Sequence, residues 1–223
     1  MGNNGSFVSN PSYHDVRFQF DPRRNIVWRE IIRYLGRRID IGNTVLDVGC
    51  GYGEFINNVR SEHRYALDAS PAMKEFLDPA VTFVAADACA TEHSFPQGVF
   101  DFIFSSNLLE HLKREEVGCL LASFRKALKP GGHAGILMPN YRLAASRYFD
   151  DYTHQTAISD VALRDWMIAE GFEVVISEPG FMPFSMKGSA IPITPWLIRL
   201  WLWSPIKPGA GQMLIVGRRP HSG

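Results

Sequence analysis

Three glycines alternate with other residues directly after a run of β-branched and aliphatic side chains, at Gly49, Gly51 and Gly53. The run, Thr44 to Val48, is typical of a strand that is buried on both faces. Glycine has no Cβ, so the backbone can turn sharply here and lie close to a ligand. In doubly wound α/β sheets, cofactors bind at such a loop, where a parallel strand ends. We therefore expect a cofactor site here, followed by a helix.

The spacing of the loop indicates which cofactor it suits. A dinucleotide-binding loop has the pattern G-x-G-x-x-G, whereas this loop is G-x-G-x-G and continues with Glu54. Asp47, in the preceding strand, would repel a pyrophosphate but attract a cation or an ammonium group. S-adenosylmethionine carries an ammonium group and a sulfonium group. Together with Cys50, these residues resemble the first motif of the class I S-adenosylmethionine-dependent methyltransferases.

Two later acidic residues have the spacing expected for nucleoside contacts. Asp68 ends a second predicted strand, about 20 residues beyond the glycine loop, the offset at which nucleotide-binding sheets place a carboxylate on ribose hydroxyls. The alternative is that Asp68 only caps the helix that follows it. The resemblance implies ribose contacts for Asp68 and Ala69, and adenine contacts for Asp87 and Ala88 after a third predicted strand.

Strand and helix patterns alternate along most of the chain, and the resemblance covers roughly residues 40–180. About seven strands are expected, which predicts an α/β fold with a Rossmann-like, mostly parallel, doubly wound sheet and helices on both faces. The resemblance implies that the last strand is antiparallel. It also assigns the turn after the fourth strand to the cofactor site, with Ser106, Asn107 and Leu108. We expect an N-terminal segment with a capping helix at 1–40 and the methyltransferase domain at 41–223.

The composition indicates which kinds of partner the chain is expected to bind. The 23 basic and 23 acidic residues among 223 cancel, so no basic footprint predicts a nucleic-acid partner. The three cysteines are scattered without metal-ligand spacing and are typical of reduced thiols, and the first 20 residues contain no apolar leader. We expect a cytoplasmic protein without a metal, although acidic residues beside a histidine, as near His154, are also able to hold a divalent cation.

Two regions outside the cofactor scaffold are expected to select the acceptor. The first is the N-terminal segment, where Tyr13 precedes a helix predicted at 24–38. In related enzymes such a helix closes over cofactor and acceptor, and the alternative is a helix that only covers one end of the sheet. The second is an apolar lid or insertion at 181–211, between the last two strands, which contains Phe181, Phe184 and Trp196.

The apolar run at 196–203 is much shorter than the roughly 20 residues of a membrane span. Three roles stay open for it. It can line a pocket, form an oligomer contact, or lie at a membrane surface with Arg199 and Lys207 near headgroups and a lipid-linked acceptor. The sequence leaves the oligomeric state open.

Methyl transfer requires an acceptor held in line and the removal of one proton. His111 and His154 follow predicted strands and are candidates for the base, with a structural role as the alternative for each. The D-x-T-H segment resembles methyltransferases of glycan and natural-product pathways, which implies that His154 faces the acceptor and Asp151 orients it. The residues expected to position a hydroxylated acceptor are Arg147 and Tyr152.

The sequence therefore predicts a methyltransferase that uses S-adenosylmethionine, releases S-adenosylhomocysteine and methylates a small molecule. A hydroxyl of a sugar, glycan precursor or natural product is the expected acceptor. Two alternatives stay open, namely a protein or RNA acceptor on the same scaffold, and a non-catalytic module that binds the cofactor or docks on membranes.

Overall fold

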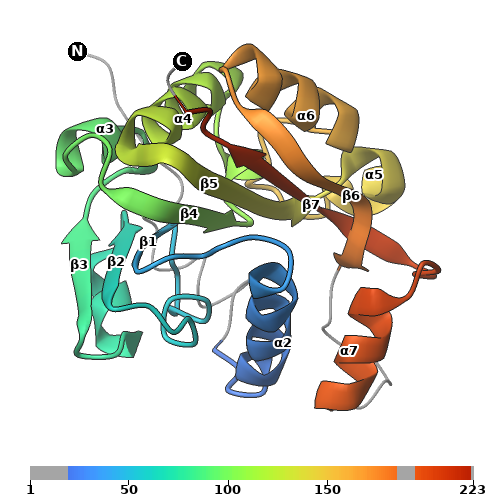
Figure 1. Cartoon of the computed structure of the whole chain (residues 1–223). Helices are drawn as coiled ribbons and strands as arrows, with labels where there is room; N and C mark the ends of the chain where they lie inside the picture. The colour runs from blue at the N-terminus through green and yellow to red at the C-terminus, as the bar shows by residue number, and fades with distance from the viewer. Residues whose placement is uncertain (1–19, 185–193, 222–223) are drawn as a thin grey trace.

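A computed structural model of the chain describes residues 20–184 and 194–221 (Figure 1). Within these residues, seven strands form one sheet in the order β3-β2-β1-β4-β5-β7-β6. The first five strands along the chain pair in parallel, and β7 is antiparallel to both of its neighbours. This confirms the predicted fold class. The strands are β1 Thr44–Val48, β2 His63–Asp68, β3 Val81–Ala85, β4 Phe100–Ser106, β5 Leu128–Pro139, β6 Glu173–Pro183 and β7 Ala210–Arg218.

Helices cover both faces of the sheet, with α4 and α6 on one side and α2 and α7 on the other (Figure 1). Each face therefore has its own apolar core, as expected for strands that are buried on both faces. The helices are α2 Arg24–Gly36, α3 Thr91–Ser94, α4 Arg114–Ala127, α5 Tyr141–Tyr148, α6 Asp160–Ala169 and α7 Pro195–Trp203, and the 3₁₀ turns are η2 Pro71–Phe76, η3 Ala88–Ala90 and η4 Leu109–His111.

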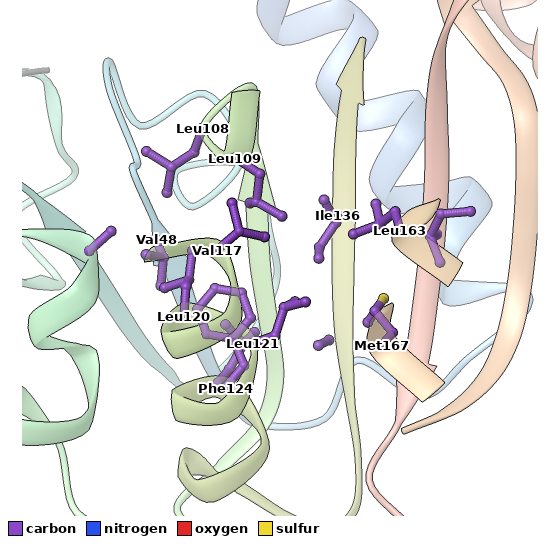
Figure 2. Packing of buried hydrophobic residues seen from close by; sticks show 14 of the residues in the cluster. Val48, Leu108, Leu109, Val117, Leu120, Leu121, Phe124, Ile136, Leu163 and Met167 are labelled. Carbon is purple, nitrogen blue, oxygen red and sulfur yellow. The ribbon is translucent and has the colours of Figure 1, made fainter. Parts of the chain in front are cut away.

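The core beneath α4 supports the segment that follows β4. Figure 2 shows Leu108 and Leu109 in the same apolar cluster as Val117 of α4 and Ile136 of β5. Leu109 is fully buried. Burying a leucine stabilises a fold by roughly 1.5–3 kcal/mol, so this anchor holds η4 in place at the end of β4.

The helix predicted after the glycine loop is wrong, because residues 51–58 form a run of turns. Gly51 and Gly53 have φ of 49° and 69°, outside the helical region. Two side chains also take backbone carbonyls as partners: Asn57 Nδ2 donates to Phe76 O and Asn58 Nδ2 donates to Glu54 O. Such side-chain bonds compete with helix formation.

The predicted bounds of the insertion are also wrong, because β6 continues to Pro183 and β7 begins at Ala210. The segment between the two strands is therefore shorter at both ends than 181–211. Phe181 belongs to β6, is fully buried and packs on Tyr34 of α2, with ring centroids 5.4 Å apart. The described part of the segment is dominated by α7.

Helix α7 packs on α2 through a buried carboxylate. Glu30 of α2 is 4% exposed, and its Oε2 accepts a 2.7 Å hydrogen bond from Arg199 Nε. Lys207 Nζ similarly donates to Glu178 Oε2 at 2.8 Å. Both cations therefore have acidic partners within the chain, and the membrane-surface role stays one of the three open predictions for 196–203. Among the described residues, no helix combines the length and apolar character that crossing a bilayer requires.

Candidate active site

All three glycines of the loop after β1 have a left-handed backbone, with φ of 71°, 49° and 69° at Gly49, Gly51 and Gly53. A Cβ at Gly49 would lie 3.0 Å from Leu108 Cδ2, and one at Gly53 would lie 2.3 Å from Leu77 Cδ2. The loop therefore requires glycine both for its backbone and for the space around it. It forms a close-fitting bare backbone surface at the carboxyl edge of the sheet.

Asp68 stands at the end of β2, beside this loop, and its side chain is 3% exposed. Its Oδ2 accepts a hydrogen bond from the Gly51 N–H and its Oδ1 accepts one from the Ser70 N–H, both at 2.9 Å. Two backbone donors hold the carboxylate at the loop and stabilise its charge. The structure thus brings together the glycines and the acid that the sequence predicted separately, with Ala69 next in the chain.

Asp47, in β1, is 3% exposed. Burial, the nearby charge of Asp68 and, to a smaller extent, Glu54 raise its pKa well above the usual range, against a hydrogen bond from the Ile56 backbone that lowers it. The neighbouring Cys50 thiol also has a raised pKa, because it is buried close to Asp47 and Asp68. This end of the sheet therefore favours a positively charged group, which would relieve the repulsion between the two carboxyl groups.

The adenine side of the predicted site is more open. Asp87 is exposed and its Oδ1 accepts a 2.8 Å hydrogen bond from the Cys89 N–H at the start of η3. Ala88 is buried. Asp87 is therefore the N-cap of η3, and its outward position is compatible with the predicted contact to an amino group.

Asn107, after β4, is the only described residue other than glycine with a positive φ, at 51°. Its Nδ2 donates to Ser106 Oγ at 3.0 Å, and its Oδ1 accepts from Gln212 Nε2 of β7 at 3.2 Å. Leu108 packs against Gly49. The predicted turn is therefore tied both to the glycine loop and to β7. Sequence reasoning missed Gln212, and no local pattern marks it.

A second group of polar side chains comes from two segments far apart in the sequence. Thr153 Oγ1, in the loop between α5 and α6, donates to Asp151 Oδ1 at 2.6 Å and lies 2.8 Å from His111 Nδ1. Because the single hydroxyl proton points to the carboxylate, His111 Nδ1 carries the proton of the second contact. The lone pair of neutral His111 is then on Nε2.

The Asp151 carboxylate is thus connected to His111 through Thr153, and its predicted role toward His154 stays a prediction. Burial would raise the pKa of Asp151, but the hydrogen bonds from Thr153 and the nearby His111 and His154 outweigh it and lower the pKa. His154 packs edge-on against His111 and against Tyr148, with ring centroids 4.8 Å apart in both pairs. The structure thus joins all three predicted catalytic residues in one cluster.

Backbone bonds fasten the two segments together. The Gln155 and Thr156 N–H groups both donate to Glu110 O, at 2.8 and 3.2 Å, and Gln155 Nε2 donates to His111 O at 2.6 Å. Thr156 Oγ1 adds a 2.6 Å bond to Leu112 O. The loop that carries His154 is therefore held rigidly against η4.

Glu110, which sequence reasoning missed, lies next to this cluster and is fully buried. Burial raises its pKa to about 8, and burial lowers the pKa of His111 to about 4, so both side chains are mainly neutral near pH 7. A signal for Glu110 exists in the sequence, since an acid surrounded by Leu108, Leu109 and Leu112 is expected to be buried.

The predicted acceptor residues fall into two groups. Arg147 of α5 stacks over the Phe184 ring, 5.3 Å from its centroid, and Tyr152 is 65% exposed in the loop that carries His154. Phe181 lies in the core beside α2, and Trp196 is 62% exposed on α7. Tyr13 lies outside the described residues. Acceptor binding stays a prediction for each.

One known protein family matches most of the chain. Residues 20–177 match the family described as "Methyltransferase domain", which is more than half of the chain. The chain therefore belongs to this family of class I S-adenosylmethionine-dependent methyltransferases and has its Rossmann-like fold.

Two curated relatives share a name. The chain is 35% identical over 101 residues to phosphoethanolamine N-methyltransferase 1 of Triticum aestivum, a match covering 41% of this chain and 20% of that protein. It is 33% identical over 153 residues to phosphoethanolamine N-methyltransferase 1 of Arabidopsis thaliana, covering 61% of this chain and 30% of that one. The chain thus spans less than a third of either relative.

Among solved structures, the fold is similar to that of a SAM-dependent methyltransferase from Archaeoglobus fulgidus, with a TM-score of 0.66. The two share 21% identity, and the match covers 93% of this chain and 97% of that one. At this identity the likeness shows the fold alone.

Proposed function

We propose that the chain transfers a methyl group from S-adenosylmethionine to the nitrogen of a small amine that also carries a phosphate, as a phosphorylated amino alcohol does. The observation that carries this proposal is the 33% identity, over 153 residues, to a protein named phosphoethanolamine N-methyltransferase. The nitrogen replaces the hydroxyl that the sequence analysis preferred, because the names of the two curated relatives specify N-methylation.

The cofactor side of the site fits S-adenosylmethionine. The bare backbone at Gly49–Gly53 leaves room for close approach, Asp68 is held beside this loop, which supports its proposed contact with the ribose, and Asp47 favours a cationic group. Bound there, the cofactor supplies an electrophilic methyl group. The chain itself positions the acceptor, which is the main requirement of an in-line displacement.

Arg147 supports a phosphate on the acceptor. It is exposed, and it immediately precedes Tyr148, whose ring contacts His154 of the polar cluster. A guanidinium binds phosphate through two parallel hydrogen bonds. Its stacking on Phe184 would hold the side chain in place for such a contact. An amine is mainly an ammonium ion near pH 7, so it must first lose one proton, to water or to the cluster, before its lone pair can attack the methyl group. The neutral amine then needs no further ionisation, and the main task of the cluster is to bind and orient it.

A hydroxyl acceptor is the second candidate. The hydrogen bonds that connect Asp151, Thr153 and His111 favour it. A hydroxyl must lose a proton during methyl transfer, and the Nε2 lone pair of His111 is suited to accept it. The acceptor atom therefore distinguishes the two candidates.

The test is a methyl-transfer assay with isotopically labelled S-adenosylmethionine and matched acceptors, namely phosphoethanolamine, ethanolamine, and small polyols. Mass spectrometry of the products identifies the methylated atom. We expect label on the nitrogen of phosphoethanolamine and at least tenfold less on ethanolamine, which lacks the phosphate. Label only on hydroxyls would support the second candidate. The absence of label in a protein that binds S-adenosylhomocysteine would overturn both.

A further inference from the structure

Glu110 presents an unusual carboxyl group. It is fully buried, and neither Oε1 nor Oε2 has a hydrogen-bond partner in the part of the chain that the structure describes. Leaving a buried polar group unsatisfied costs about 1–3 kcal/mol, and more when the group is charged. This cost applies whether or not the carboxyl group carries its proton. A group of this kind indicates that something else binds to it.

Two imidazoles stand beside this carboxyl group. One ligand atom each from Glu110, His111 and His154 lies within 4.8 Å of the others. Ligand atoms at about 2.1 Å from a tetrahedral ion lie about 3.4 Å from one another. Side-chain movements of about 1 Å would therefore bring these three ligand atoms to the distances of a metal site. Two imidazole nitrogens and one carboxylate oxygen are the donors of many zinc, iron and manganese sites.

The surroundings of His111 match those of a metal ligand. A ligating histidine almost always donates its other ring N–H to a carboxylate, a carbonyl or water, which fixes the tautomer and the ring orientation. Here His111 Nδ1–H donates to Thr153 Oγ1 at 2.8 Å, and Thr153 in turn donates to Asp151. In this tautomer the ring lone pair of His111 is on Nε2, the nitrogen that would face an ion.

We propose that Glu110, His111 and His154 bind one divalent transition-metal ion, with zinc as the representative case. The sequence analysis expected no metal, because the two segments that supply these residues lie far apart along the chain and show no ligand spacing. Mg²⁺ and Ca²⁺ prefer all-oxygen ligands, so the two imidazoles argue against them.

The ion would give the buried carboxylate of Glu110 its partner and keep coordination positions open. Three protein ligands leave a position for water or for an oxygen of the acceptor, as in catalytic zinc sites. With the ion bound, the Nε2 lone pair of His111 is used for coordination. The cluster then holds the acceptor through the ion, and His111 does not act as the base.

The experiment titrates the metal-free 223-residue chain with Co²⁺, whose visible absorption reports coordination by protein ligands, and then competes with Zn²⁺. The variants are Glu110→Gln and His154→Ala, which alter proposed ligands, and Asp151→Asn, which alters the carboxylate bound to Thr153 behind His111. The matched control is His63→Gln, since His63 is an exposed histidine 3.8 Å from Glu62. Binding of S-adenosylhomocysteine is measured in every sample to show that each variant is folded.

We expect one equivalent of Co²⁺, displaced by Zn²⁺, with affinity at least tenfold weaker in Glu110→Gln and His154→Ala and unchanged in His63→Gln. Loss of an outer contact typically lowers metal affinity about 10–100-fold, so Asp151→Asn is also expected to bind Co²⁺ more weakly than the wild type. Failure of the wild type to bind more Co²⁺ than Glu110→Gln overturns the proposal, as does equal weakening in His63→Gln. Because S-adenosylhomocysteine binding is followed separately, a failed metal site is distinguishable from a failed methyltransferase site.

Discussion

Two buried carboxyl groups stand at the same edge of the sheet and are held in opposite ways. Asp68 accepts hydrogen bonds from two backbone N–H groups, at Gly51 and Ser70. Glu110 is more deeply buried, and among the described residues nothing donates to either of its oxygens. On the proposed assignments, the protein itself supplies the partners of the carboxyl group on the cofactor side, whereas a bound ion would supply the partner of the one on the acceptor side. The difference indicates that the two halves of the site will respond differently to mutation.

The largest effect is expected from Asp68→Ala. The variant removes the proposed partner of the ribose hydroxyls, and hydrogen bonds to a charged group contribute about 1.5–3 kcal/mol each. We expect the dissociation constant of S-adenosylhomocysteine to rise about 100-fold or more, measured by calorimetry. The control is Asp165→Ala, at an exposed position on α6. A change of less than threefold in Asp68→Ala would show that the comparison assigns the ribose to the wrong carboxylate.

A smaller effect on cofactor affinity is expected from Gly53→Ala. This variant tests whether the loop already has its binding conformation before the cofactor binds. The new Cβ would have a left-handed φ of 69° and would lie 2.3 Å from Leu77 Cδ2. The backbone penalty alone is about 1–2 kcal/mol. We expect roughly tenfold weaker cofactor binding, in keeping with this penalty.

Gly98 provides the matched control, because its φ is 67° and an added Cβ meets nothing within 4 Å. Gly98→Ala is expected to lower the free energy of unfolding by about 1 kcal/mol and to leave cofactor affinity unchanged. Equal losses of affinity in both variants would mean that general strain, rather than the shape of the loop, controls binding.

Asp47→Asn tests the repulsion between Asp47 and Asp68 through the pH dependence of the free energy of unfolding. The folded pKa of Asp47 is raised by burial and by Asp68, whereas an unfolded aspartate titrates near about 3.9. The contribution of Asp47 to the free energy of unfolding is therefore fully present below the unfolded pKa, where the carboxyl group is protonated. This contribution is lost as the pH rises through the folded pKa. We expect the asparagine variant, without cofactor, to be more stable at pH 8 by about 1–2 kcal/mol and equal to the wild type near pH 3.

Denaturant unfolding at a series of pH values measures this difference, with the exposed Asp165→Asn as the control. A stability gain that is the same at every pH would contradict the proposed repulsion between Asp47 and Asp68.

The smallest effect is expected from Thr153→Val, on the acceptor side. The change removes one hydroxyl that connects Asp151 with His111 and costs about 1 kcal/mol. We expect methyl transfer to fall about fivefold while the affinity for S-adenosylhomocysteine stays the same. Imidazole ¹⁵N shifts would show a mixture of His111 tautomers.

Thr156→Val is the matched control, because it removes a hydroxyl of the same loop whose bond goes to Leu112 O. It is expected to cost similar stability without altering the His111 tautomer. If both variants lower transfer equally, the loop matters only for its rigidity.

The two halves also differ in what the sequence could predict. Gly49, Gly51, Gly53 and Asp68 were predicted because a strand, its turn and the next strand are continuous in the chain. The helix after the loop was wrong, since left-handed glycines and side-chain bonds from Asn57 override local propensity. The fold class was predictable for the same reason as the loop, namely the alternation of strands and helices.

The acceptor side was only partly predictable. His111, Asp151 and His154 were recognised as residue types suited to chemistry, but the link through Thr153 exists only after two distant segments meet. Glu110 became a candidate ligand only because the fold buries it and brings two imidazoles next to it. The insertion bounds failed because β6 and β7 extend each other by pairing, which no local composition predicts.

The position of β7 has a consequence for synthesis of the protein. Within residues 20–184 and 194–221, β6 pairs only with β7, and β7 also pairs with β5. While residues 210–218 are still inside the ribosome, β5 presents an open edge and β6 has no strand to join. A nascent chain is therefore expected to expose two unpaired strands until almost all of this sequence has emerged, which makes this interval the point at which a chaperone is most useful.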